Sequence, residues 1–264
     1  MKDFLVAAEE AAEAAGALIR QNWQKAKEVH YKSAINLVTS VDRQAEERIV
    51  QILQKYFPDH SILAEEGTSV VTAGSDHRWI IDPLDGTTNF THAYPQVGVS
   101  IALEKKGEIV LGVVYDPIRE EKFKSVKAEG AFLNGDRITT SKVTDLDKAL
   151  LGTGFAYDRR ERADYYLSFW QAFMMRCQGI RRTGSAALDL CYLACGRLDG
   201  FWESKLHPWD TAAGSLIIRE AGGRLSDFSG NEFCILGEET LASNGLIHEE
   251  MLQTVKEVNN KQHD

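Results

Sequence analysis

Asp82 and Asp85 are the residues of this sequence whose type and spacing most clearly suggest chemistry. They follow the bulky apolar residues 79–81 and enclose a proline, a pattern that predicts a buried strand ending in an acidic turn. Two carboxylates that point toward one place repel each other unless a cation neutralises them. The spacing therefore indicates a metal site. An ordinary acidic turn is the alternative, because aspartate, proline and glycine are all common in turns.

The residues that follow, Gly86, Thr87 and Thr88, predict the start of a helix. Glycine permits a close approach of the backbone, and the first amides of a helix have no partner within it. Such amides bind anions, so a phosphate group fits directly beside the metal site. We therefore expect a metal and a phosphate to meet at the end of this strand.

Three further carboxylates occupy similar positions. Glu65 and Glu66 follow the short apolar run 61–63, which predicts a second strand end. Asp210 precedes a segment with helical spacing that ends near residues 222–223, so it is predicted to be a helix cap or a first-turn carboxylate. The plain alternatives are a solvated acidic turn for the glutamates and a bare cap for Asp210.

Taken together, these segments resemble the inositol monophosphatase family, within the superfamily of metal-dependent, lithium-sensitive sugar-phosphate phosphatases. The family pattern is a Glu-Glu pair, then D-P-[IL]-D-G-T-[TS]-N-F, then W-D at a helix start, then E-A-G-G. The matching residues are, in order, Glu65 and Glu66, residues 82–90, Trp209 and Asp210, and residues 220–223. The resemblance runs over nearly the whole chain, and no metal-binding position departs from the pattern.

The resemblance implies a site with two divalent cations. The first ion would be served by Glu65, Asp82, the backbone carbonyl of Leu84 and Thr87. The second would be held by Asp82, Asp85 and Asp210. Oxygen-only ligands select a hard ion, so Mg²⁺ is expected, with Mn²⁺ as a substitute. The family also admits a third, weaker Mg²⁺ near Glu65 and Glu66, and inhibition by lithium.

The resemblance also assigns catalytic and substrate-binding roles. Thr87 and Asp42 would orient the attacking water, and Glu65 would act with them in catalysis. Asp42 is at the same time expected to cap a helix that runs to Tyr56. The amides of Gly86 and Thr87 would hold phosphate. The remaining substrate contacts are expected at Ser185, Ala186, Glu203 and Asp210, where a plain serine cap and an exposed strand-end carboxylate are the alternatives for Ser185 and Glu203.

Bulk properties limit the class of protein. The 264 residues are 44% hydrophobic with a formal net charge of -9, which indicates a globular chain with a substantial core. No basic run is present, so nucleic acid is not an expected partner. No apolar run approaches the roughly 20 residues that span a bilayer, so we expect no membrane partner and a cytoplasmic location. The four cysteines lack zinc-binding spacing and are predicted to be reduced.

Element patterns support an α+β fold. Helices are predicted at residues 2–27, 42–56, 163–177 and 187–195, with an extended piece at 32–42 and a strand at 199–203. Strands that follow the central motif, from residue 97 to residue 133, predict a meander. The family implies a layered α-β-α-β-α sandwich. We expect an N-terminal half, 1–145, and a C-terminal half, 146–264, packed as one unit, and the family implies a homodimer.

The expected function is Mg²⁺-dependent hydrolysis of inositol monophosphate by a metal-activated water. A strong alternative is removal of the 2'-phosphate of NADP(H), alone or beside that activity, because the motifs are shared. Fructose 1,6-bisphosphate and 3'-phosphoadenosine 5'-phosphate are less favoured substrates. A regulatory binding protein on the same fold is the alternative of another class, since some bacterial relatives contact the transcription machinery. A relative that had lost its catalytic activity should also have lost a metal ligand, and all the expected metal ligands are present in this sequence.

Overall fold

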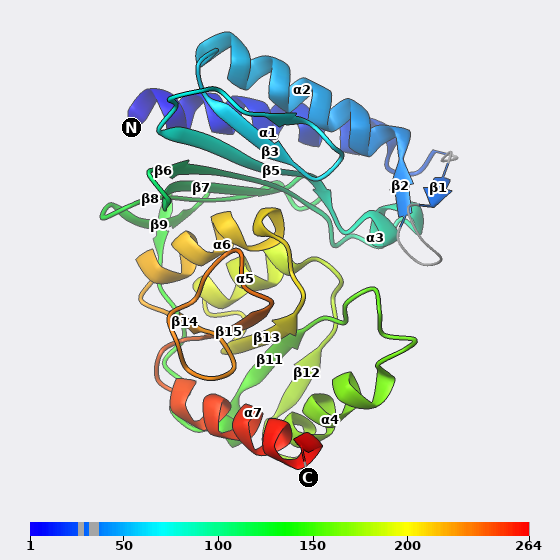
Figure 1. Cartoon of the computed structure of the whole chain (residues 1–264), viewed down its shortest axis with the longest axis vertical. Helices are drawn as coiled ribbons and strands as arrows, with labels where there is room; N and C mark the ends of the chain where they lie inside the picture. Colours follow the sequence, from blue (N-terminus) through cyan, green and yellow to red (C-terminus); the bar gives the residue numbers. More distant parts are fainter. Residues whose placement is uncertain (26–28, 32–36, 264) are drawn as a thin grey trace.

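Two β-sheets alternate with three pairs of helices along the long axis of the molecule (Figure 1). The computed structural model describes residues 1–25, 29–31 and 37–263. Within these residues, the order of layers is α1 and α2, an eight-stranded sheet, α5 and α6, a five-stranded sheet, and α4 with α7. This is the layered α-β-α-β-α arrangement expected from the sequence.

The helices are α1 (Lys2–Asn22), α2 (Ser40–Tyr56), α3 (Thr87–Thr91), α4 (Ala163–Met174), α5 (Ala186–Ala194), α6 (Pro208–Glu220) and α7 (His248–His263), with one 3₁₀ turn at Leu146–Lys148. The strands of the first half are β1 (Val29–Tyr31), β2 (Leu37–Thr39), β3 (Ser61–Ala64), β4 (Ser69–Val70), β5 (His77–Asp85), β6 (Gly98–Lys105), β7 (Glu108–Asp116), β8 (Glu121–Val126), β9 (Gly130–Leu133) and β10 (Asp136–Ile138). Those of the second half are β11 (Leu150–Thr153), β12 (Gly179–Arg181), β13 (Gly200–Ser204), β14 (Arg224–Ser226) and β15 (Glu239–Ser243).

The larger sheet has the strand order β10-β9-β8-β7-β6-β5-β3-β4. Its run from β6 to β9 is the predicted antiparallel meander, which β5 and β10 extend on either side. Strand β3 instead pairs with β5 in parallel, with Ala64 opposite Ile81. Parallel strands end at the same edge of a sheet. The residues that follow, Glu65 and Asp82, are therefore neighbours.

The smaller sheet has the order β12-β11-β13-β15-β14. Its first three strands are parallel, and Thr153 at the end of β11 lies opposite Trp202 in β13. The carboxyl ends of these strands, where ligand sites of open sheets with parallel strands form, face the same region as the end of β5.

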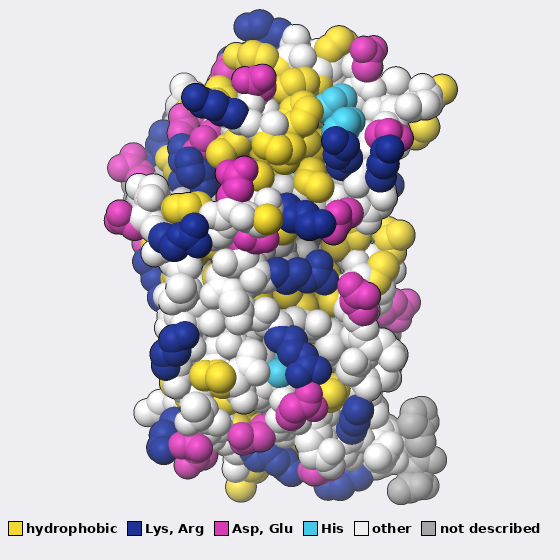
Figure 2. Space-filling model, turned by 90° about the vertical axis from the view of Figure 1, so that its left-hand side faces the viewer, with side chains coloured by type: hydrophobic (Ala, Val, Ile, Leu, Met, Phe, Trp, Pro, Cys, Tyr) yellow, Lys and Arg dark blue, Asp and Glu magenta, His cyan; other side chains and the backbone are white. Residues whose placement is uncertain are grey.

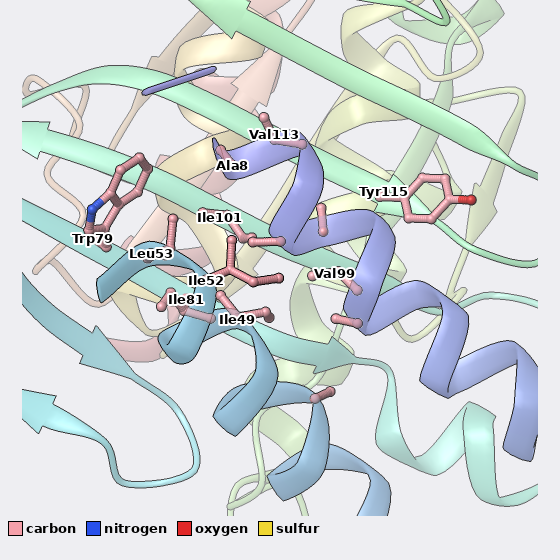
Figure 3. Close-up of a cluster of buried hydrophobic side chains, with 14 of the residues drawn as sticks. Ala8, Ile49, Ile52, Leu53, Trp79, Ile81, Val99, Ile101, Val113 and Tyr115 are labelled. Carbon is pink, nitrogen blue, oxygen red and sulfur yellow. The ribbon is translucent and has the colours of Figure 1, made fainter. Parts of the chain in front are cut away.

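Alanines let α1 pack closely on the larger sheet. Its buried face consists of Ala7, Ala8, Ala11, Ala12, Ala15, Gly16 and Ile19. A side chain at Gly16 would overlap the Tyr115 ring, which explains the glycine at this point of the helix. Ile49, Ile52 and Leu53 of α2 complete the layer above the β5 and β6 side chains, as Figure 3 shows.

The helices α5 and α6 fill the space between the two sheets. Their side chains share one hydrophobic cluster with residues of both sheets, including Val114 and Phe123 from the larger sheet, Leu190 and Ile217 from the helices, and Phe201 from the smaller sheet. Burial of apolar surface of this kind is the main stabilising contribution to folding. The two halves of the chain therefore meet in a common core, and the division near residue 145 stays a prediction.

Element boundaries differ from expectation at several places. Helix α1 ends at Asn22 and α4 at Met174, each a few residues early. The helix expected to start at Asp42 begins at Ser40, with Thr39 as its cap, so the assignment of Asp42 as the capping residue was wrong. The predicted extended piece falls partly on residues 32–36, which lie outside the described residues.

The surface mixes charges of both signs. On the face drawn in Figure 2, Lys and Arg side chains alternate with Asp and Glu, and hydrophobic side chains gather toward the upper end. All four cysteines are free thiols, and Cys191 is buried. Over the described residues, no helix combines the length and the apolar character that a membrane crossing requires.

Candidate active site

A cavity of about 530 Å³ opens where the end of β5, the starts of α5 and α6 and the carboxyl ends of β11 and β13 converge. Of the residues predicted to bind metal or substrate, every one lines it: Glu65, Asp82, Leu84, Asp85, Gly86, Thr87, Ser185, Ala186, Glu203 and Asp210. Asp42 lies behind this wall, in contact with Thr87. The fold thus brings segments far apart in the sequence to one place.

Strand β5 and Gly86, which has a left-handed backbone conformation, position Asp82 and Asp85. The pairing of β5 with β6 is irregular between these two aspartates. The Asp82 Oδ1 atom accepts a hydrogen bond from the Leu84 amide at 2.9 Å. Gly86 has φ 93°, and a Cβ there would lie 2.8 Å from the carbonyl oxygen of Gln96. Both facts require glycine at this position, where α3 begins.

Asp42 connects the start of α2 to Thr87. Its Oδ2 atom accepts a hydrogen bond from the Thr39 amide at 2.9 Å, which completes a capping box with the Thr39 side chain. Its Oδ1 atom accepts one from the Thr87 hydroxyl at 2.8 Å. Asp42 is therefore the third-position member of the capping box and not the cap, and its other oxygen makes the expected contact with Thr87. Burial raises the pKa of this carboxyl, and the hydrogen bonds from Thr39 and Thr87 oppose that shift.

Asp85 is bound by the start of α5. Its Oδ2 atom accepts hydrogen bonds from the Ser185 hydroxyl at 2.6 Å and from the Ala187 amide at 2.8 Å. Ser185 is the cap of α5, as in the plain alternative, and its hydroxyl donates to Asp85; a contact between Ser185 and substrate stays a prediction. Removal from water raises the pKa of Asp85 to about 6, and these hydrogen bonds limit the shift.

Asp210 is held by a second capping box. Its Oδ2 atom accepts a hydrogen bond from the His207 amide at 2.6 Å, with His207 as the cap and Pro208 as the first residue of α6. Asp210 is therefore a first-turn carboxylate, one of the two positions predicted. A hydrogen bond of 3.0 Å from the Ser100 hydroxyl to the Trp209 carbonyl ties this helix start to β6.

Burial and mutual repulsion together act on Asp82, Asp85 and Asp210. Burial, and then the charges of Glu65, Asp85 and Asp210, raise the pKa of Asp82 well above its usual range. Burial and the Asp85 charge likewise raise the pKa of Asp210. Carboxylates in such surroundings bind either protons or cations at neutral pH.

The donor set fits a hard divalent cation. The side chains of Glu65, Asp82, Asp85 and Asp210 all offer carboxylate oxygen, the kind of ligand that such cations prefer. In the part of the chain that the structure describes, no three acidic, histidine or cysteine side chains lie close enough together to enclose an ion as they stand.

The wall of the cavity also contains residues that were not predicted from the sequence. Asp189, Arg182 and Gly154 line it together with Glu203, which was predicted. Desolvation by the cavity walls raises the pKa of Glu203 to about 8, while the Arg182 charge opposes the shift. Asp189 is buried and accepts a hydrogen bond from the Thr183 hydroxyl at 2.6 Å. Asp189 lies in the first turn of α5, directly after Ala187 and Leu188. A carboxylate in that position is the sequence signal that could have identified Asp189 as a cavity residue.

Comparison with known proteins agrees with this geometry. The model of the inositol monophosphatase family matches residues 1–260. The chain is 45% identical over 256 residues to the inositol-1-monophosphatase of Synechocystis, covering 97% of this chain and 89% of that protein. It is 42% identical over 259 residues to the Nus factor SuhB of Escherichia coli K12, covering 97% of each.

A solved structure is also similar. The inositol monophosphatase of Anabaena superposes with a TM-score of 0.89 at 40% identity, covering 97% of this chain and 96% of that one. This similarity confirms the layered α+β fold. The resemblance inferred from the acidic motifs is likewise confirmed: the chain belongs to the inositol monophosphatase family, whose members are phosphatases that generally depend on metal.

Proposed function

We propose that this protein is a Mg²⁺-dependent phosphomonoesterase that hydrolyses inositol monophosphate or a closely similar polyol phosphate. The observation that carries the proposal is the convergence of Glu65, Asp82, Asp85 and Asp210 on one cavity that Glu203 also lines. The four carboxylates suit cations and phosphate, and Glu203 suits a leaving group with hydroxyls.

In this proposal the cations are divided between two sets of ligands. The first set is Glu65, Asp82, the Leu84 carbonyl and Thr87, and the second is Asp82, Asp85 and Asp210. Bound divalent cations would neutralise the carboxylates, lower the pKa of a water and stabilise the departing oxygen. Mn²⁺ would substitute for Mg²⁺, a third ion near Glu65 and Glu66 fits the same chemistry, and lithium would inhibit.

The Thr87 hydroxyl has the geometry to orient the attacking water. It lies 2.8 Å from Asp42 Oδ1 and 3.2 Å from the Leu84 carbonyl oxygen, so its single proton is directed into the protein. A lone pair of its oxygen can then accept a hydrogen bond from a water in the cavity. Glu65 at the neighbouring strand end would act with Thr87 and Asp42 on that water.

Substrate would be held through its phosphate group and through its hydroxyls. The amides of Gly86 and Thr87 would bind phosphate at the start of α3. The polyol would contact Glu203, Asp210 and the backbone near Ser185 and Ala186. Because the Ser185 hydroxyl donates a hydrogen bond to Asp85, Ser185 would contribute to substrate binding indirectly, by holding Asp85 in place.

A second candidate activity is removal of the 2'-phosphate of NADP(H). The cavity volume of about 530 Å³ lies within the range of pockets that enclose drug-sized ligands, and Arg159 and Arg182 on its wall offer charges to a larger anion. Fructose 1,6-bisphosphate and 3'-phosphoadenosine 5'-phosphate are weaker candidates. A homodimer is the proposed assembly.

A regulatory role is the candidate of another class. The relative from Escherichia coli carries the name Nus factor, which is not the name of a hydrolase. We put hydrolysis first, because the whole predicted acidic set lines the cavity in this chain.

Phosphate release from inositol 1-phosphate, NADP⁺, fructose 1,6-bisphosphate and 3'-phosphoadenosine 5'-phosphate, with and without Mg²⁺, tests the proposal. We expect Mg²⁺-dependent release, fastest from inositol 1-phosphate. A folded, Mg²⁺-supplied protein that releases phosphate from none of them would refute hydrolysis of these substrates and favour the regulatory candidate.

A further inference from the structure

Gly154 and Glu203 leave the smaller sheet side by side. Strands β11 and β13 are parallel, with Thr153 opposite Trp202, and the Thr153 hydroxyl donates a hydrogen bond of 2.7 Å to the Trp202 carbonyl. The next residue of each strand is Gly154 and Glu203, respectively. Both line the cavity.

The Glu203 carboxylate occupies the space that a side chain at residue 154 would fill. A Cβ built on Gly154 overlaps Oε1, Oε2 and Cδ of Glu203, and it meets no backbone atom as closely. The backbone at Gly154 is outside the left-handed region, so its conformation does not by itself require glycine. The space taken by the carboxylate is therefore what selects glycine here.

Other groups restrict where this carboxylate can lie. The buried Asp189 lines the same wall and repels Glu203, whereas Arg182 attracts it. A methyl group at residue 154 would push a flexible side-chain end aside, which costs little folding free energy but moves a charged acceptor within the cavity.

We infer that Gly154 is a specificity-determining residue, which fixes the Glu203 carboxylate in position to accept hydrogen bonds from the hydroxyls of the leaving group. The inference rests on the proposed function and extends it. It assigns to a glycine the selection of polyol esters over esters whose leaving group has no hydroxyls.

The test compares two esters with the full chain and Mg²⁺. The readout is the ratio of kcat/KM for inositol 1-phosphate to kcat/KM for p-nitrophenyl phosphate, whose leaving group lacks additional hydroxyls. In Gly154→Ala we expect this ratio to fall by about tenfold or more, the size of a lost hydrogen bond to a charged group. The matched control is Gly179→Ala on the adjacent strand β12, where the added Cβ stays 3.4 Å from its nearest neighbours and outside the cavity. Its ratio should equal that of the wild type.

A double-mutant cycle separates positioning from general damage. Glu203→Ala removes the carboxylate and makes room for a methyl group at residue 154. If Gly154 acts through Glu203, the double variant has the same ratio as Glu203→Ala alone. A further fall of the ratio in the double variant would overturn the inference, as would an unchanged ratio in Gly154→Ala. Thermal unfolding of each variant shows whether it is folded.

A crystal structure of Gly154→Ala gives a readout that does not depend on activity. A displaced Glu203 carboxylate is the expected result, and an unmoved one would overturn the inference even in a protein that hydrolyses neither ester. Failure of the proposed function has a different signature, because the wild type would then release no phosphate from either ester.

Discussion

Asp82 and Asp210 each accept a hydrogen bond from a backbone amide two or three residues away, whereas Glu203, on the same cavity wall, is positioned by packing and charge from distant segments. The first arrangement is built into short motifs that contain their own turn or cap. The second exists only after β11, β13 and α5 have assembled. Asp85 resembles Glu203 in this respect, because its hydrogen bonds come from the start of α5. The comparison teaches that Asp82 and Asp210 are positioned locally, whereas Glu203 and Asp85 are positioned by tertiary structure.

The largest effect is expected from Asp85→Asn. We expect phosphate release from every ester to fall by about 10³-fold, because a charge that would hold a cation is lost. The hydrogen bonds from Ser185 and Ala187 can still be accepted by the asparagine oxygen, so the metal-free thermal unfolding midpoint should not fall. Steady-state kinetics and thermal unfolding measure the two quantities. A variant with wild-type activity would remove Asp85 from the proposed cation set.

His248 is a buried titratable side chain outside the cavity, and it belongs to neither proposed set of cation ligands. Its ring is fully buried between Ser226, 3.0 Å from Nε2, and Ser243, 2.9 Å from Nδ1. Burial lowers the pKa of His248 to about 4. The unfolded chain, with a pKa near 6.5, therefore binds more protons between these values, and the contribution of His248 to stability is lost as the pH falls from about 6.5 toward 4.

The measurement is the free energy of unfolding of the wild type and of His248→Gln across this pH range. We expect the wild type to lose about 3 kcal/mol more than the variant as the pH falls, because each pKa unit corresponds to 1.36 kcal/mol. The carboxylates titrate equally in both proteins, so their contributions cancel in the difference between the two free energies of unfolding. Parallel curves would show that His248 is not held neutral by burial.

Addition of Mg²⁺ should stabilise the protein. Binding to the folded state alone contributes about 2.7 kcal/mol at a concentration 100 times the Kd. We expect the thermal unfolding midpoint to rise with Mg²⁺ and to return when EDTA is added. Asp85→Asn should show a smaller rise, and Gly179→Ala a full one. An equal rise in Asp85→Asn would place the cation elsewhere.

The smallest effect is expected from Glu203→Gln. At a pH above the Glu203 pKa of about 8, the substitution keeps the shape but removes the charge, so kcat/KM should fall for inositol 1-phosphate more than for p-nitrophenyl phosphate, by about tenfold. The selectivity of this loss distinguishes the role of Glu203 from that of Asp85, since Asp85→Asn should affect both esters. An equal loss for both esters from Glu203→Gln would remove that distinction.

The accuracy of the sequence-based predictions follows the same division. The helix start after Gly86, the first-turn position of Asp210 and the meander were predicted correctly, since each depends on residues close together in sequence. The acidic turn expected at Asp82 was wrong, because β5 continues through Asp85, where it still pairs with β6. The cap of α2 was placed on Asp42 instead of Thr39, because both residue types cap helices and the choice depends on local backbone geometry. The hydrogen bond from Ser185 to Asp85 was not predicted, because the two residues lie in different elements.

The sequence by itself determined the family and, through the family resemblance, the layered fold. It also identified Glu65, Asp82, Asp85 and Asp210 as the acidic residues of the cavity, because residue type and short-range spacing specify caps and oxygen ligands. Tertiary structure alone decided that Asp85 binds the start of α5, that Asp42 reaches Thr87, and that Gly154 makes room for Glu203. The physical reason is that these contacts join elements distant in the chain. Their distances are set by how sheets and helices pack, which no local pattern records.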